Sequence, residues 1–166
     1  MSGSPPTRSS RSGRTRRARE YRFPVEIEWA GGRRTVVLVH GKEPLVIATP
    51  PEFKGSDPEA WSPEDAFVAA AGSCLAVTIA ALAEHRRLPL RGLVVRAEGV
   101  VARRDDGRLG FVRIEQHVRL ETDDGQEDAA RALVARAEAG CLVSASLDVP
   151  VETSVDVRIP QVVTSP

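Results

Sequence analysis

Two cysteines, Cys74 and Cys141, are the residues of this 166-residue chain whose chemistry is most informative. The sequence contains no other cysteine and no CxxC pair. Its three histidines (His40, His85 and His117) are isolated, so we expect no metal site. Cysteines this far apart in the sequence are either two buried apolar thiols or a reactive pair that meets in the folded protein.

A segment predicted to form a long helix carries Cys74. Residues 66–83 contain no charged side chain and eight alanines. Ser62 is a typical N-cap and Pro63 suits the first helical position. The uncharged stretch is as long as a membrane span, but its alanines make it only weakly hydrophobic. We therefore predict a helix, ending near His85, that is buried on all sides in a soluble protein and lies outside the membrane.

Strand patterns lie on both sides of this helix, and a second helical pattern follows them. The order β-β-β-α-β-β-α-β indicates an α+β fold. It contains no strand–helix–strand repeat of the kind that makes parallel sheets. The strands are predicted at residues 25–29, 35–39, 45–48, 93–101, 109–120 and 153–159, and the second helix at 126–139.

Charge divides the chain into two parts. Residues 1–20 contain six arginines and a single acid, whereas the whole chain has a formal net charge of zero, so residues 21–166 are net negative. We expect a disordered Arg-rich tail over 1–20, acting as a polyanion contact or an inert extension, and one domain over 21–166. A nucleic-acid partner for the domain is not expected. No signal peptide is evident, so the reducing cytoplasm is the expected compartment.

The apolar helix also predicts an oligomer. A helix that is apolar all round needs cover on more than one side, and one sheet from a chain of this length covers only one face. We therefore predict a homodimer in which the helices over 66–83 are sandwiched between sheets of both chains. Trp29 and Trp61 are expected in the core or at the dimer interface.

The segments around the two cysteines follow a specific pattern. Residues 62–74, SPEDAFVAAAGSC, are similar to the motif Asn-Pro-Glu-x-Leu-x-x-Ala-x-x-x-x-Cys, and residues 137–144, AEAGCLVS, to Ala-x-x-x-Cys-Pro-x-Ser. Both motifs are those of the OsmC/Ohr superfamily, the osmotically inducible protein C and organic hydroperoxide resistance proteins. A weaker similarity covers residues 29–33 and 51–55. The chain thus resembles this superfamily, in its general OsmC-like branch, over residues 22–159.

The resemblance implies both a fold and an activity. It implies an intertwined homodimer whose central helices are wrapped by antiparallel sheets, and a cofactor-free thiol peroxidase that reduces organic hydroperoxides. By the same resemblance, Cys74 is the attacking thiol and Cys141 the resolving thiol. Glu64 is the carboxylate at the start of the helix, and Arg33 is the activating cation. An external dithiol, such as a lipoyl group on a partner protein, is the expected reductant.

This chemistry needs a stabilised thiolate at Cys74. An unperturbed thiol is only roughly 3% ionised at pH 7, and lowering its pKa by about two units takes roughly 2.7 kcal/mol. A nearby arginine could provide that energy and could also bind a carboxylate such as Glu64. Glu64 precedes Cys74 by ten residues, about 15 Å along a straight helix. Contact through one arginine therefore requires a break in the helix, for which Gly72 is the candidate.

Two departures from the superfamily pattern leave a second function open. Leu142 stands where the superfamily usually has proline, and Glu52 stands where the OsmC branch has an arginine. The second change leaves Arg33 as the remaining candidate cation. The alternative function is that of a noncatalytic OsmC-like protein, which binds a hydrophobic small molecule in the dimer cleft.

Overall fold

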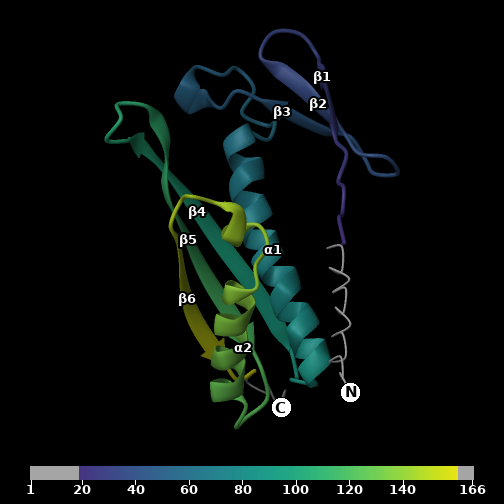
Figure 1. Ribbon diagram of the computed structural model, residues 1–166, viewed down its shortest axis with the longest axis vertical. Helices are drawn as coiled ribbons and strands as arrows, with labels where there is room; N and C mark the ends of the chain where they lie inside the picture. The colour runs from purple at the N-terminus through teal and green to yellow at the C-terminus, as the bar shows by residue number, and fades with distance from the viewer. Residues whose placement is uncertain (1–18, 161–166) are drawn as a thin grey trace, which may run out of the picture.

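The computed structural model describes residues 19–160 (Figure 1). The predicted tail, residues 1–20, therefore lies almost wholly outside the described residues. The elements follow the predicted order, and their bounds differ by at most two residues from those expected. They are β1 (Glu26–Trp29), β2 (Arg34–Leu38), β3 (Leu45–Ala48), the 3-10 helix η1 (Pro51–Phe53), α1 (Pro63–Arg86), β4 (Gly92–Arg103), β5 (Leu109–Glu121), α2 (Glu127–Ala139), the 3-10 helix η2 (Ser144–Ser146) and β6 (Val151–Arg158).

The first sheet is a small antiparallel meander, β1-β2-β3. Its first turn uses Gly31 and Gly32, both with positive φ, a conformation that glycine adopts without steric cost. The sheet lies at the N-terminal end of α1 (Figure 1). It is tied there by the N–H of Ala48, which donates to the carbonyl of Trp61 at 2.8 Å.

Helix α1 begins with a complete capping box. The Ser62 hydroxyl accepts from the N–H of Asp65, whose carboxylate accepts from the N–H of Ser62. The helix then runs unbroken through Gly72, so the break that contact of Glu64 and Cys74 through one arginine would require is absent. Gly72 has a packing role instead. A Cβ there would lie 3.2 Å from the Cβ of Ala97, so the glycine lets α1 approach β4 closely.

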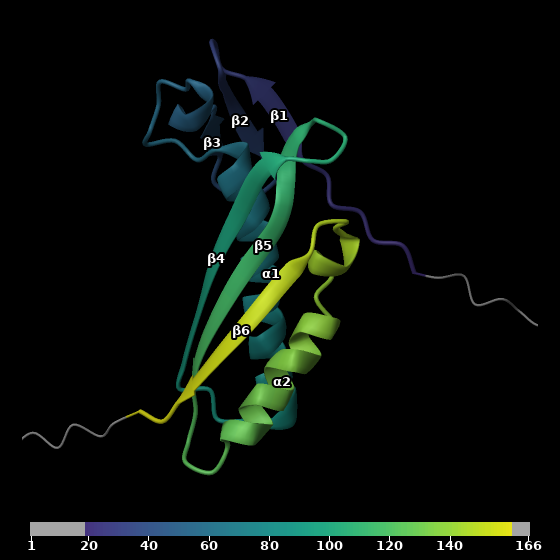
Figure 2. The same cartoon turned by 90° about the vertical axis from the view of Figure 1, so that its left-hand side faces the viewer.

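The second sheet corrects the expectation of purely antiparallel sheets. Strand β4 pairs with β5 in the antiparallel sense, but β5 pairs with β6 in the parallel sense. The chain reaches β6 through α2, which lies against the same side of the sheet as α1 (Figure 2). The segment β5-α2-β6 is thus a strand–helix–strand unit that the predicted order contained and the interpretation overlooked. The α+β class itself is confirmed.

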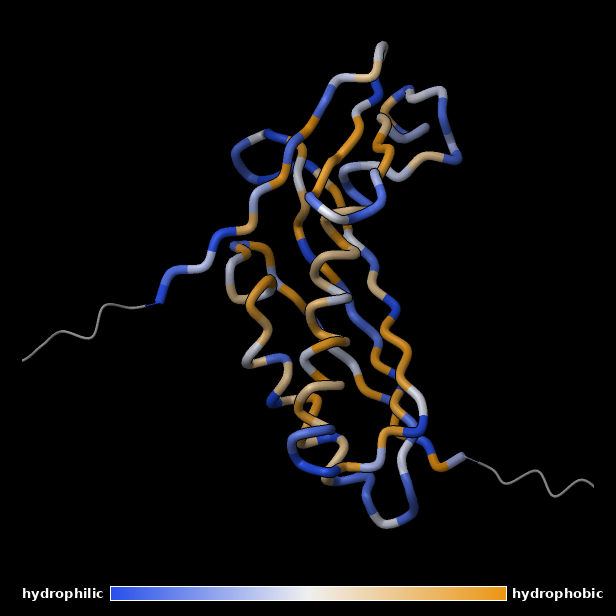
Figure 3. The backbone as a smooth tube through the Cα atoms, turned by 90° about the vertical axis from the view of Figure 1, so that its right-hand side faces the viewer, coloured by the Kyte–Doolittle hydropathy of each residue, from blue (hydrophilic) through white to orange (hydrophobic). Residues whose placement is uncertain are grey.

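One core lies between α1, α2 and the second sheet. Its buried members are Leu75, Ile79, Ala83, Val118, Leu120, Ala130, Leu133, Val134, Ala137 and Cys141. Hydrophobic residues also continue around the rest of α1 (Figure 3). Val77 on that side is 65% exposed, so within one chain α1 is buried on one face. Its burial on all sides, which was predicted for a homodimer, stays a prediction.

The outward surface of the first sheet is apolar as well. Phe23, Val25, Ile27 and Trp29 alternate along the chain, and all four are exposed. Trp29 is 75% exposed and Trp61 is 47% exposed, so neither tryptophan lies in the core of the single chain. Their predicted place at a dimer interface stays a prediction.

Helix α1 is long and apolar enough to cross a membrane, judged by length and composition. The core helix of a soluble protein meets the same criterion. In this fold α1 packs against β4 and α2, and its buried residues belong to the protein core.

Candidate functional site: a pair of thiols

The fold brings the two cysteines together. Cys74 lies in the middle of α1 and is partly buried, whereas Cys141 directly follows Gly140, the C-cap of α2, and is fully buried. Both belong to the core where α1 packs against α2. The Cys74 side chain lies close enough to the Cys141 sulfur to help lower the pKa of Cys141. Both cysteines are free thiols in this structure.

Hydrogen-bond donors surround the sulfur of Cys141. The Ser144 hydroxyl donates to it at 3.2 Å, and the backbone N–H groups of Val143 and Ser144 also donate to it. Burial acts to raise the pKa of the Cys141 thiol, but these hydrogen bonds and the nearby Cys74 side chain outweigh burial and lower the pKa below its ordinary value. Cys141 therefore ionises more readily than an ordinary cysteine thiol, although it is buried.

Cys74 has fewer polar neighbours. Its carbonyl accepts a hydrogen bond from the Thr78 hydroxyl at 2.7 Å, and the neighbouring Ser73 hydroxyl donates to the carbonyl of Ala69. Among residues 19–160, no arginine side chain donates to the sulfur of Cys74. The cation that a reactive Cys74 needs is therefore not supplied by the described part of one chain.

Glu64 lies in the first turn of α1, away from the thiols. Because α1 is continuous, roughly 15 Å of helix separates it from Cys74. Glu64 lines a cavity of about 620 Å³, and its Oε2 is buried without a hydrogen-bond partner among the described residues. The cavity walls are mostly apolar, with Pro50, Pro51, Phe53, Gly99, Val101 and Leu109 among them.

Arg33 lies in the turn between β1 and β2. Its guanidinium donates to the carbonyls of Phe53 and Lys54, at 3.1 and 3.3 Å. Phe53 also lines the cavity of Glu64, so both predicted residues adjoin the same loop. Within the described residues Arg33 makes no ion pair with Glu64. The structure thus places the two cysteines close together, but within one chain neither Arg33 nor Glu64 lies with them.

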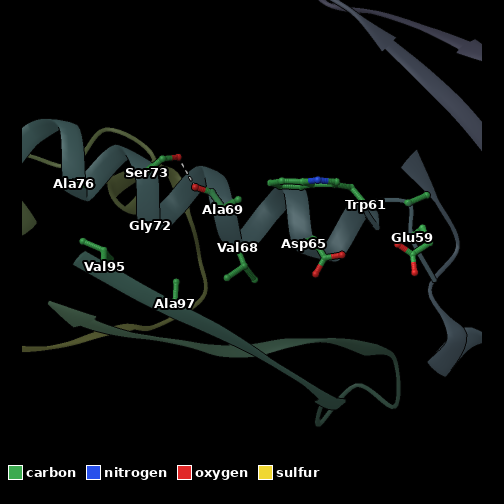
Figure 4. A pocket seen from close by; sticks show the side chains of 11 residues that line it. Glu59, Trp61, Asp65, Val68, Ala69, Gly72, Ser73, Ala76, Val95 and Ala97 are labelled. Carbon is green, nitrogen blue, oxygen red and sulfur yellow. Dashed lines mark hydrogen bonds between the residues drawn. The ribbon is translucent and has the colours of Figure 1, made fainter. Parts of the chain in front are cut away.

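A second cavity, of about 550 Å³, follows the exposed side of α1 toward β4. Figure 4 shows Trp61 extending along the helix, with Val95 and Ala97 on the facing strand. The residues that α1 contributes are mainly small, and they lie three and four positions apart: Ala69, Gly72, Ser73 and Ala76. This spacing places them on one side of the helix and leaves a shallow groove between helix and strand.

Sequence reasoning missed one residue of the thiol site, Ser144. It was part of the motif around Cys141, but the motif alone assigned no role to it. The available signal was its position three residues after the cysteine, because a tight turn brings residues with this spacing together. The N–H of Ala145 donates to the carbonyl of Cys141 at 3.0 Å and closes this turn.

The chain is similar to known proteins in sequence and in fold. The family model described as OsmC-like protein matches residues 55–156. An uncharacterized protein of Bacillus subtilis, YmaD, is 27% identical over 145 residues, covering 84% of this chain and 95% of that protein. Among solved structures, an OsmC-like protein of unknown function from Vibrio cholerae is similar with a TM-score of 0.75 and 15% identity, over 82% of this chain and 100% of the other. An organic hydroperoxide resistance protein from Elizabethkingia anophelis is similar with a TM-score of 0.69 and 18% identity, over 86% and 99%.

Proposed function

Because the chain belongs to the OsmC-like protein family, we propose that it is a cysteine-dependent peroxidase that reduces organic hydroperoxides to alcohols. The observation that carries this proposal is that Cys74 and Cys141, 67 positions apart in the sequence, pack together in one core. A peroxidase that forms an internal disulfide needs two thiols within bonding reach. The fold shared with a protein named for organic hydroperoxide resistance supports the choice of substrate.

The reaction proceeds in three steps. The ionised sulfur of Cys74 attacks the terminal oxygen of the hydroperoxide, the O–O bond breaks, and the alkoxide takes a proton and leaves as an alcohol. Cys74 is then a sulfenic acid, which condenses with Cys141 to give a disulfide and water. An external dithiol, a lipoyl group being the expected one, reduces the disulfide by thiol–disulfide exchange. These three reaction steps use no bound cofactor, and we place them in the cytoplasm.

The two thiols differ in solvent exposure, and this difference assigns them different roles. Cys74 is partly exposed and can meet a substrate, whereas Cys141 has no exposed surface. A hydroperoxide can therefore reach Cys74 first. Cys141 can react only with a group that is already held beside it, which is what a resolving thiol does.

A second copy of the chain completes the site in this proposal. Glu64 has a buried oxygen without a partner among the described residues, and Cys74 has no cation near it there. The uncovered side of α1 and the exposed apolar residues Ile27 and Trp29 offer the surfaces through which two chains can pack. In such a homodimer, Arg33 of one chain or the other is the proposed cation for Cys74 and Glu64.

Stopped-flow kinetics test the proposed activity. The reduced protein is mixed with cumene hydroperoxide or with hydrogen peroxide, and peroxide loss is followed together with the number of free thiols. We expect rapid reaction with the organic peroxide, abolished in Cys74→Ser. It should be retained in Ser73→Ala, a matched change at the neighbouring position. Thiols that stay inert to both peroxides would favour the noncatalytic binding protein, with the apolar cavity beside Glu64 as its ligand site.

A further inference from the structure

The turn after α2 builds a thiolate-binding nest around Cys141. The chain leaves α2 at Gly140 and folds back at once, with the N–H of Cys141 donating to the carbonyl of Glu138 and that of Ala145 to the carbonyl of Cys141. This turn directs the hydroxyl of Ser144 and two successive backbone N–H groups at the sulfur of Cys141. Donors that converge on one atom favour its anionic form.

No fixed charge contributes to this nest within the described chain. Apolar side chains from α1, β5, α2 and β6 form the core cluster that contains Cys141, and Cys74 packs against it. The influences on the pKa of Cys141 among the described residues are burial and hydrogen bonds, with no charged group among them. The nearest charged residues on α2, Arg136 and Glu138, are exposed. The protonation of Cys141 is therefore governed by hydrogen bonds, and the Ser144 hydroxyl is the one side-chain donor besides Cys74.

We propose that Ser144 is a positioning residue that holds Cys141 as a thiolate, aimed at Cys74, for the step that closes the disulfide. This inference deepens the proposed function and rests on it for its consequence in the reaction. The Cys141 thiolate attacks the sulfur of the Cys74 sulfenic acid formed by the organic hydroperoxide. The S–S bond forms as the S–O bond breaks, and hydroxide leaves and takes a proton to become water. Cys141 is oxidised in this step and the Cys74 sulfur is reduced.

The hydrogen-bond donors around Cys141 should make disulfide formation faster at neutral pH. A buried thiol without donors would stay protonated and resolve the sulfenic acid slowly, leaving time for overoxidation by a second peroxide. The donors around Cys141 lower its pKa in spite of full burial. Ser144 thus links the turn after α2 to the rate of disulfide formation.

Thiolate titration tests the inference without relying on peroxidase activity. In the Cys74→Ala background, Cys141 is the one remaining thiol of the chain, and its ionisation is followed by absorbance at 240 nm against pH. We expect Ser144→Ala to move the transition to higher pH, and Ser144→Thr, which keeps the hydroxyl, to restore it. Ser146→Ala is the matched control, because the Ser146 hydroxyl donates to the carbonyl of Leu142 in the same turn and has no contact with Cys141.

The catalytic consequence is tested with both cysteines present. After one equivalent of cumene hydroperoxide, loss of the second thiol at pH 7 should be about tenfold slower in Ser144→Ala, the effect of removing one hydrogen bond to a charged sulfur. Loss of the first thiol should be unchanged. An unshifted titration in a folded Ser144→Ala protein would overturn the inference. A shifted titration in a protein inert to peroxide would leave the nest established and overturn the proposed function instead.

Discussion

Gly99 in β4 is a position at which one added methyl group should disturb the packing beside the cavity of Glu64. A Cβ on Gly99 would lie 2.5 Å from Cε1 of Phe111 and 2.5 Å from Cγ2 of Val68, more than 1 Å inside the usual carbon–carbon contact distance of about 3.5–4.0 Å. Neither neighbour can easily retreat. Phe111 stacks on Phe67 with ring centroids 4.6 Å apart, and Val68 is fixed on α1.

The expected cost of Gly99→Ala follows from these contacts. Overpacking of this kind destabilises a protein by about 1–3 kcal/mol. Alanine suits a strand better than glycine by about 0.5–1 kcal/mol, so the net loss, taken from the middle of both ranges, should be about 1 kcal/mol. In urea, at one fixed protein concentration, this corresponds to a fall of roughly 1 M in the unfolding midpoint.

Gly110→Ala provides the matched control in the adjoining strand. There the nearest atoms belong to the flexible side chain of Arg104, at 3.2 Å, so the added methyl group should cost little. If Gly99→Ala were as stable as the wild type and as Gly110→Ala, the close packing of β4 against Phe111 and α1 would be refuted. The cavity beside Glu64, which Gly99 also lines, would then need a different description.

Three further predictions concern the N-cap of α1, the loss of stability at low pH and the exposed apolar surface of β1. Ser62→Ala removes the capping box of α1 and should lower the free energy of unfolding by about 1 kcal/mol, whereas Ser62→Asp should retain most of it, as measured by urea unfolding. The bidentate pair of Arg91 with Asp123 lowers the pKa of that carboxyl, so its stabilisation is present above the ordinary aspartate pKa and is lost as pH falls through the lowered value. Asp123→Asn should therefore unfold more easily than the wild type at pH 7, and the difference should vanish in acid and shrink in 1 M salt. Ile27→Asp places a charge in the exposed apolar surface of β1 and should convert the proposed homodimer to a monomer in light scattering; an unchanged mass would exclude this surface from the interface.

Local signals in the sequence were sufficient to predict most elements. The Ser62 cap and Pro63 mark where α1 begins, and the alternating strand patterns place β4 and β5 on either side of a turn. These features depend on neighbouring residues alone. The resemblance of the two cysteine motifs to those of the superfamily implied a pair of thiols, and the fold places both cysteines in the core between α1 and α2. Their roles in catalysis stay a prediction.

Features set by tertiary contacts were not predictable in the same way. The order β5-α2-β6 was visible in the sequence and is compatible with parallel pairing, but the register of β6 on β5 depends on where α2 packs, which no pattern within β6 records. Gly72 reads as a helix breaker in isolation, but the approach of Ala97 explains it as a packing residue. Leu142, which stands where the superfamily usually has proline, is 70% exposed, and its carbonyl accepts a hydrogen bond from the Ser146 hydroxyl. The donor role of Ser144 emerges only from the turn after α2.

The thiol count after one equivalent of cumene hydroperoxide tests the central claim most directly. The reduced protein is treated anaerobically, and the remaining thiols and any disulfide are identified by mass spectrometry of its peptides. We expect the loss of two thiols per chain and a Cys74–Cys141 disulfide within the same chain. Retention of both thiols, or oxidation of Cys74 alone to a sulfinic acid, would contradict it.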